Sequence, residues 1–399
     1  MLKILNKFCF IFFIWLLGSS FVVANFKEIK KKAEINYPEI IFPIPGNLEK
    51  CITKMYIEPK MNPVKPILKV EAPTGYGLDD RFDNALNNFS NFSHPCSGGN
   101  IKACENVKRV ILDWAKADAA KRTGPSDHEG RHWNDTLTVN LYIASPMLAA
   151  YSFAKQVIDV PSEEDQIIKK WFKKIVKRNE HLMFDMIYKK NTQATGVPKR
   201  AHNHALSSAI AHMELGVLLN DKKLFRKAFK NFEAAIRYQR KDGSLPIEVR
   251  RGGRAMFYQG RAMNALAVIA IIAENQGYNI WDYEYKGKNY HNLVKFFIDF
   301  TEDNKIVFKY AKEMKSPGPA KDYKTQDLNK SSSNWGWLYA YATRFPDHDN
   351  IKRLKKWSQD VSNLNNYQKK IVYQFENVSK IGFTYMSWTV VEPFCHFTK

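Results

Sequence analysis

Residues 242–273 of this 399-residue chain read DGSLPIEVRRGGRAMFYQGRAMNALAVIAIIA. The last nine of these residues are apolar on every face of a helix, and such a helix is buried on all sides. The stretch therefore predicts a helix in the inner layer of a two-layer helical protein. We expect this helix at 254–273, after a turn at Asp242 and Gly243 and a short extended piece that ends at Val249.

Apolar residues at helical spacing recur on both sides of this stretch. No alternation of strands and helices appears before residue 370, and the tail after it fits a short strand or another helix. Paired helices of similar length predict an all-α protein of stacked helical hairpins. The expected helices begin near 104 and 162 and cover about 133–157 with a kink at Pro146, 203–219, 222–240, 289–302, 333–345 and 350–360.

The N-terminal quarter has a different composition. Residues 1–24 combine a lysine-containing start, a short apolar run and a small-residue cleavage site, which is typical of a signal peptide. We expect cleavage and export to the periplasm. Residues 25–100 are rich in proline and are expected to form an irregular arm with a lid loop at about 70–93. One helical domain is expected over 101–399.

The formal net charge of the chain is +21. A strongly basic protein favours a polyanionic partner. For an exported protein, an acidic polysaccharide fits this charge better than nucleic acid does. An AT-rich genome, which enriches Lys, Asn and Ile, is an alternative source of the same composition.

Four cysteines remain once Cys9 leaves with the signal peptide. An even number in an exported chain predicts two disulfides, with three pairings open. Cys96 and Cys104 bracket a short loop that a disulfide would close. That pairing would leave Cys51 to join Cys395.

His128-Glu-Gly-Arg-His132 matches the H-E-x-x-H pattern of zinc peptidases. Two imidazoles four residues apart on a helix can hold zinc, with Glu129 as the base. Gly130 weakens a helix here, Arg131 brings a positive charge, and no third ligand stands out. A loop at the rim of a cleft is the alternative that we prefer. The chain has no nucleophile elbow, phosphate-binding loop or dinucleotide fingerprint.

Two places in the chain carry residues suited to chemistry on an acidic sugar. Arg251 precedes Tyr258 by seven residues, so two helical turns, or a glycine-containing loop, would bring them together. A guanidinium binds a carboxylate and a phenol can transfer a proton. Asn203 and His204 open an expected helix, where they would neutralise a carboxylate. The alternatives are solvated arginines beside a core tyrosine, and a helix cap with a surface histidine.

Aromatic residues recur near the C-terminal end of the helical region. Trp335 and Tyr339 lie four residues apart, so a helix would place them on one face. Aromatic faces stack on sugar rings, and the same spacing is common in protein cores. Both interpretations stay open from the sequence.

Together these segments resemble the alginate lyases of the poly-β-D-mannuronate lyase family. Residues 242–258 look like its D-G-x-L-P-x-E-L-x-R-x-x-R-A-L-x-Y segment, and Asn203-His204 like the end of its N-N-H motif. Residues 337–345 look like its W-L-E-P-Y segment, and the similarity runs from about 104 to 346. The chain departs from the pattern at His202, which replaces an Asn. It also departs at 259–261, where Gln-Gly-Arg replaces His-Asn-Tyr, and at Ser207, which replaces an aromatic residue.

The resemblance implies an (α/α) toroid, an incomplete barrel of paired helices, acting as a monomeric polysaccharide lyase without metal or cofactor. Its partner would be an anionic polysaccharide, with no role for nucleic acid or, after signal removal, for a membrane. Tyr258 would be both base and acid in a β-elimination, and His204 the base for the opposite epimer. The implied catalytic residues are Asn203, His204, Arg251 and Tyr258. The implied substrate-binding residues are His202, Arg254, Arg261, Trp335, Trp337 and Tyr339.

Three alternatives remain from the sequence. A lyase of the same fold would act on another uronan, such as glucuronan. A binding protein would keep the fold and have lost catalysis. A zinc peptidase would use the H-E-x-x-H segment.

Overall fold

The computed structural model describes residues 26–44, 64–70, 80–122, 138–178, 193–314, 322–328 and 335–377. Helices make up most of these residues, which confirms the prediction of an all-α protein. The only sheet among them is the parallel pair of two-residue strands β1 (Lys69–Val70) and β2 (Lys121–Arg122). The α-helices are α2 (Phe26–Lys32), α4 (Asp80–Ser97), α5 (Ile101–Lys116), α7 (Ser145–Val157), α8 (Ser162–Lys177), α10 (Asn203–Leu219), α11 (Lys222–Tyr238), α12 (Pro246–Val249), α13 (Ala255–Asn275), α14 (Tyr290–Glu302), α15 (Phe308–Ala311), α16 (Gly336–Arg344), α17 (Asp349–Gln359) and α18 (Asn366–Asn377). A π-helix, η1 (Val139–Ala144), and three 3₁₀ turns, η2 (Lys199–Ala201), η3 (Gly252–Arg254) and η4 (Asn304–Val307), complete them.

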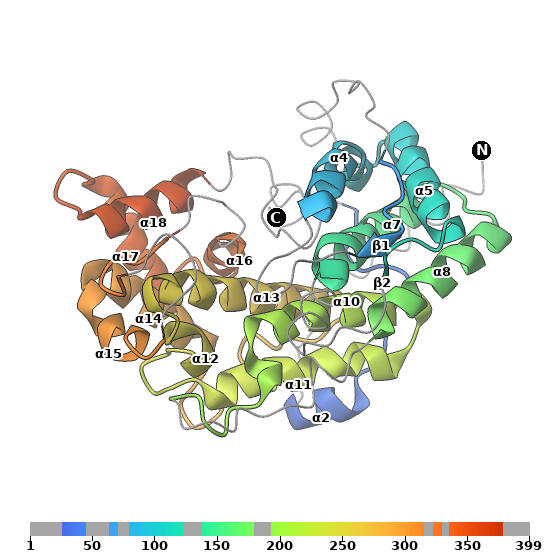
Figure 1. The fold of residues 1–399 in the computed structure, drawn as a ribbon. Coiled ribbons are helices and arrows are strands. Elements are labelled where there is room, and N and C mark those ends of the chain that lie inside the picture. Colours follow the sequence, from blue (N-terminus) through green and yellow to red (C-terminus); the bar gives the residue numbers. More distant parts are fainter. Residues whose placement is uncertain are drawn as a thin grey trace.

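Two long helices, α10 and α13, form the inner layer. Both are buried along nearly their whole length, and they pack against each other. Figure 1 shows them crossing the middle of the molecule, with α11 along the outer side of α10. By length and composition the segment Gly252–Asn275 would be long enough to cross a membrane, but 89% of its most apolar window is buried inside the protein. It is therefore the core helix that its composition predicted.

The hairpin of α10 and α11 shows how local sequence sets the pairing. Asn220 ends α10 in the left-handed conformation, at φ 52°. Asp221 then caps α11, accepting hydrogen bonds from the backbone N–H groups of Lys223 and Leu224. Gly216 permits the close approach, because a Cβ there would lie 2.5 Å from the backbone nitrogen of Phe225. A tight turn and a small residue thus fold the outer helix back onto the inner one.

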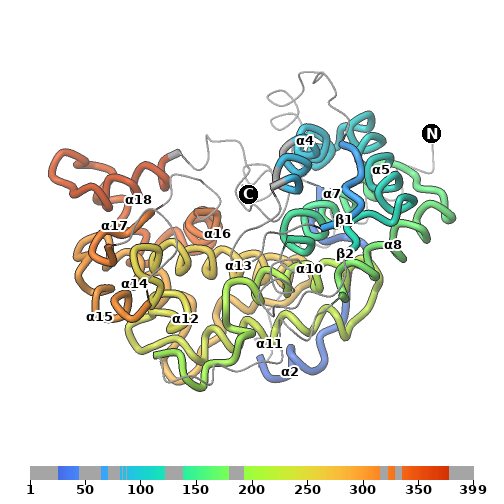
Figure 2. Tube along the Cα trace, viewed as in Figure 1, coloured from blue at the N-terminus to red at the C-terminus, as the bar shows by residue number. Residues whose placement is uncertain are grey.

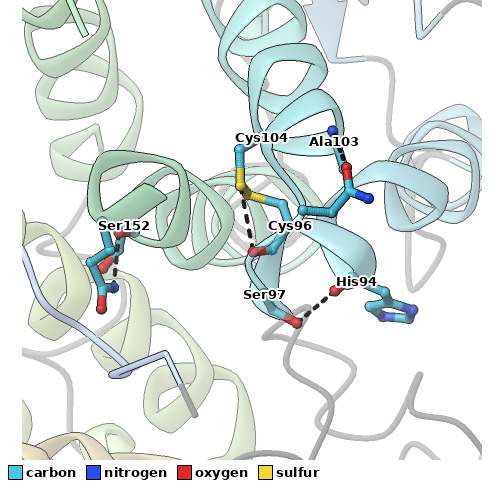
Figure 3. Close-up of a disulfide and its surroundings, with 8 residues drawn as sticks. His94, Cys96, Ser97, Ala103, Cys104 and Ser152 are labelled. Carbon is cyan, nitrogen blue, oxygen red and sulfur yellow. Dashed lines mark hydrogen bonds between the residues drawn. A yellow bond between two sulfur atoms is a disulfide. The ribbon is translucent and has the colours of Figure 1, made fainter. Parts of the chain in front are cut away.

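The remaining helices gather at the two ends of this inner layer. Figure 1 shows α4, α5, α7 and α8 at one end and α14, α15, α17 and α18 at the other. The chain runs from the first group, coloured blue to green, to the second, coloured orange to red (Figure 2). A disulfide between Cys96 and Cys104 joins the end of α4 to the start of α5, which is one of the pairings that the sequence left open (Figure 3). Cys51 and Cys395 lie outside the described residues, as do residues 1–24, which were predicted to be a signal peptide.

The prediction of an irregular arm over residues 25–100 was wrong in two places. Helix α2 lies against α11, and the 18-residue helix α4 occupies most of the segment expected to be a lid loop. Buried Phe82, Phe89, Phe92 and Cys96 give α4 a helical stripe that the abundance of proline nearby obscured. Of the expected lid, residues 71–79 lie outside the described segments.

Residues 33–44, which follow α2, form neither helix nor strand and hydrogen-bond to side chains of other helices. The carbonyl oxygens of Tyr37 and Ile40 accept hydrogen bonds from the side-chain amide of Gln276, at the end of α13. The Ser152 hydroxyl of α7 donates to the carbonyl oxygen of Glu39. This segment therefore satisfies polar groups on α7 and α13 at once.

Most predicted helices are confirmed, with differences at two points. The extended piece expected before Val249 is instead the helical turn α12, because Pro246 presets a helical φ at its first position. The kink expected at Pro146 is the change from the π-helix η1 to α7. Helix α18 lies in the region whose structure the sequence left open.

Candidate active site

The start of α10 presents three polar residues in succession. His202 has an extended backbone and caps the helix, its Nδ1 accepting the backbone N–H of His204 at 3.4 Å. The two imidazole rings meet edge to face, with centroids 4.5 Å apart. His202 and Asn203 are buried, whereas His204 is half-buried. The helix mouth therefore holds both imidazoles and the amide in fixed positions.

Glu248 of α12 lies directly behind Asn203. Its Oε1 accepts the backbone N–H of Asn203 at 2.8 Å, and its Oε2 accepts the side-chain N–H at 2.7 Å. The carboxyl group is fully buried. We did not predict Glu248 as a site residue. A charged residue between the apolar Ile247 and Val249 was the available signal.

Arg251 and Tyr258 meet, as their spacing predicted. The Arg251 guanidinium lies over the Tyr258 ring, with Cζ 3.6 Å from the ring centroid. The helix does not reach back to Arg251. Gly252, at φ 57°, opens the 3₁₀ turn η3, and α13 begins only at Ala255. A glycine loop therefore aims the arginine, which was the second of the two routes considered.

Arg251 also links this pair to the mouth of α10. Burial lowers the pKa of His204 well below its ordinary value, and the charges of Arg251 and Arg261 lower it further. Burial likewise lowers the pKa of His202, with contributions from His204 and Arg251. Both imidazoles are therefore neutral at neutral pH. A neutral imidazole can accept a proton or donate one hydrogen bond from its N–H.

Burial raises the pKa of Glu248 to about 7, while Arg251 and the two Asn203 hydrogen bonds oppose that rise. The Arg251 side chain is 7% exposed, and nothing in the described part of the chain accepts a hydrogen bond from its Nε. A buried guanidinium with a free N–H is suited to bind an anion.

The other predicted arginines lie around this cluster. Arg261 is half-buried on α13, with its Cζ 5.4 Å from the Phe257 ring centroid. Its charge helps to lower the pKa of His204. Arg254 is half-buried in η3, and its backbone N–H donates to the carbonyl oxygen of Arg251. Arg261 therefore adds positive charge beside His204.

The predicted aromatic contacts divide into two kinds. Trp337 is fully buried and Trp335 is 2% exposed, and both rings pack against Phe297 of α14. Neither has a free face for a sugar, so their prediction as substrate contacts is corrected to a place in the core. Tyr339 is half-buried, and sugar contact stays a prediction for it.

The H-E-x-x-H segment from His128 to His132 lies outside the described residues. Within the described residues, no three His, Cys, Asp or Glu side chains are grouped closely enough to hold a metal ion.

Comparisons with known proteins show which family the chain resembles. Residues 83–307 match the family model for alginate lyase. An alginate lyase from Pseudomonas syringae pv. tomato is 31% identical over 177 residues, which is 43% of this chain and 42% of the relative. One from Cobetia marina is 28% identical over 185 residues, 46% of this chain and 45% of the relative. The matched part thus spans less than half the length of either relative.

Solved structures show the same fold. Alginate lyase A1-III from Sphingomonas species A1 superposes with a TM-score of 0.60 at 17% identity, covering 81% of this chain and 92% of that one. A variant of A1-III complexed with a tetrasaccharide gives a TM-score of 0.61 at 18% identity, with the same coverage. These neighbours confirm the predicted (α/α) toroid. Because the family model matches more than half of the chain, the protein belongs to the alginate lyase family.

Proposed function

We propose that the protein is a polysaccharide lyase that cleaves a uronate polymer, alginate or polymannuronate, by β-elimination. The observation that carries the proposal is the contact of Arg251 with Tyr258, together with its electrostatic effect on His204. These groups come from different elements, and together they offer an anion-binding cation, a phenol and a neutral imidazole.

The reaction would begin with removal of the proton on C5 of a uronate. That proton is weakly acidic, because the neighbouring carboxylate opposes a second negative charge. Asn203, His204 and Arg251 would neutralise the carboxylate with hydrogen-bond donors and charge. Tyr258, as the phenolate, would take the C5 proton, and the phenol so formed would protonate the C4 oxygen as the C4–O bond breaks. This leaves an unsaturated sugar and returns Tyr258 to the phenolate. One residue can serve both steps when the proton and the leaving oxygen lie on one face, as in mannuronate.

Four observations support an acidic polysaccharide as the substrate. The two relatives described above are named alginate lyases. The A1-III variant binds a tetrasaccharide. The chain carries a net charge of +21, which attracts a polyanion. A buried guanidinium at Arg251 would regain hydrogen bonds on binding a carboxylate.

We further propose that the protein works in the periplasm as a monomer, after cleavage of residues 1–24. The basis is the composition of the segment, a lysine-containing start and an apolar run before small residues. Mass spectrometry of the protein recovered from the periplasm would show a chain beginning near residue 25. Recovery of a chain that still carries residues 1–24 would contradict the proposal.

The test of the function is product formation on a panel of polyuronates. The purified protein would be incubated with polymannuronate, polyguluronate and glucuronan, and unsaturated ends measured by ultraviolet absorbance and mass. We expect product from polymannuronate. Product from glucuronan alone would assign a different uronan. Saturable binding without product from any polymer would identify a binding protein and overturn the proposal.

A further inference from the structure

Glu248 is a buried carboxylate with no role in the reaction proposed above. It is 0% exposed and lies behind Asn203, so it cannot touch a substrate. A buried charge is costly unless hydrogen bonds compensate it. Its position beside a candidate catalytic residue calls for a specific explanation.

The geometry of the contact fixes the Asn203 amide. Both Glu248 oxygens accept an N–H from Asn203, one from the backbone and one from the side chain, at 2.8 and 2.7 Å. A carboxylate has only acceptors, so the amide nitrogen, not its oxygen, must face Glu248. An amide nitrogen carries two protons. Once Glu248 holds one of them, the amide plane and the direction of the second N–H are set.

The second N–H has only a weak partner in the described structure. The Nε2 atom of His202 lies 3.4 Å from the Asn203 amide nitrogen, which is long for a hydrogen bond. The N–H is therefore available to a better acceptor. In the reaction proposed above, that acceptor is the substrate carboxylate.

We propose that Glu248 is a positioning residue, which holds the Asn203 amide so that its second N–H points at the carboxylate of the bound uronate. The inference rests on the proposed function. Glu248 also polarises the amide, because an anion at one N–H strengthens the hydrogen bonds in a connected chain.

The negative charge of Glu248 is essential to this arrangement. A proton on either oxygen would replace an acceptor with a donor, opposite an N–H that also donates. Its pKa, raised by burial to about 7, places this change near neutral pH. Of the basic residues near it, Arg251 faces the site and Arg250 is paired with Glu313 at 3.1 Å. Other titratable groups on the neighbouring elements include His202 and His204 at the start of α10, Tyr258 and Arg261 on α13, and Lys309 and Tyr310 on α15, the last two of which contact Asp242.

Glu248→Gln is the direct test, because it keeps the shape and removes the charge. Glutamine offers one acceptor and turns a donor toward Asn203. We expect kcat to fall about 10- to 100-fold with KM within about threefold. The acid limb of the kcat profile near pH 7 should also disappear, because a glutamine at this position does not titrate. A merely structural role would leave the shape of that profile unchanged.

Glu214→Gln is the matched control. Glu214 is also fully buried on α10, and burial raises its pKa well above the ordinary value, which favours the neutral acid. Glutamine resembles the neutral acid, and we expect wild-type kcat. Melting temperatures of both variants would separate unfolding from loss of catalysis.

Two further measurements complete the test. If Glu248 acts through Asn203, Asn203→Ala combined with Glu248→Gln should be no slower than Asn203→Ala alone. Additive losses would overturn the inference. In protein labelled with ¹⁵N-asparagine, the Asn203 side-chain signal should titrate near pH 7 in the wild type and stay constant in Glu248→Gln.

The NMR measurement distinguishes this inference from the proposed function, because it needs no turnover. A titrating signal in a protein that forms no product would keep the Glu248–Asn203 contact and overturn the function. Full activity of a folded Glu248→Gln variant would keep the proposed function and overturn the positioning role of Glu248.

Discussion

Replacing Tyr258 with Phe should separate the chemistry from the fold. The Tyr258 side chain is 8% exposed, and the Arg251 guanidinium lies 3.6 Å from its ring centroid. Phenylalanine keeps the ring, its packing and most of the cation–π attraction. Among the described residues, none forms a hydrogen bond with the Tyr258 hydroxyl. We therefore expect the free energy of unfolding to change by less than about 1 kcal/mol.

The effect on the reaction should be much larger. General acid–base catalysis contributes about 10²- to 10⁴-fold per group, and Tyr258 is proposed to act at two steps. We expect kcat to fall by at least about 10³-fold, which corresponds to about 4 kcal/mol of activation free energy. Initial rates of unsaturated-product formation at saturating polymannuronate would measure this loss. Calorimetric binding of the same polymer should remain within about threefold of wild type.

Tyr341→Phe provides the opposite pattern as a control. Tyr341 is fully buried, and its hydroxyl lies 2.7 Å from His291 Nδ1 and accepts the Asn350 side-chain N–H at 3.3 Å. Its removal leaves buried partners unsatisfied, so we expect a loss of about 1–3 kcal/mol of stability with kcat unchanged. If Tyr258→Phe kept more than a tenth of the wild-type kcat, Tyr258 would not be the proton-transfer residue.

Three further predictions concern stability. Replacing Cys96 and Cys104 with Ser opens a loop of sequence separation 8, and the unfolded chain gains conformational entropy. We expect urea denaturation to show a free energy of unfolding lower by about 2.5 kcal/mol. An unchanged midpoint would show that the disulfide does not constrain the unfolded chain. Gly243 has a φ of 89°, and Gly243→Ala would place a methyl group 1.9 Å from the carbonyl oxygen of Asn292. We therefore expect the free energy of unfolding to fall by at least about 3 kcal/mol. A variant as stable as wild type would contradict the turn geometry. Burial lowers the pKa of His202 in the fold, so the unfolded chain binds more protons and stability should fall as pH drops below about 6.5; melting temperatures at pH 7.5 and 5 would show it, and the dependence should weaken in His202→Asn.

Local pattern in the sequence predicted most of the fold correctly. The span predicted for α10 matches residues 203–219, and the start and end predicted for α13 each differ by no more than two residues. Both depend on apolar spacing and on backbone hydrogen bonds between residues four apart, which neighbours in the chain determine. The meeting of Arg251 with Tyr258 is of the same kind, because seven residues separate them. The disulfide between Cys96 and Cys104 also closes a short loop.

Only the tertiary structure decided contacts between residues far apart in the chain. Glu248 and Asn203 are 45 residues apart, and no local rule pairs the turn α12 with the mouth of α10. The burial of Trp337 likewise depends on α14, which supplies Phe297. Aromatic residues at helical spacing fit a core or a sugar platform equally well, until the opposing surface is known. Helical periodicity specifies which face of a helix is apolar, whereas the packing of the whole chain determines what that face meets.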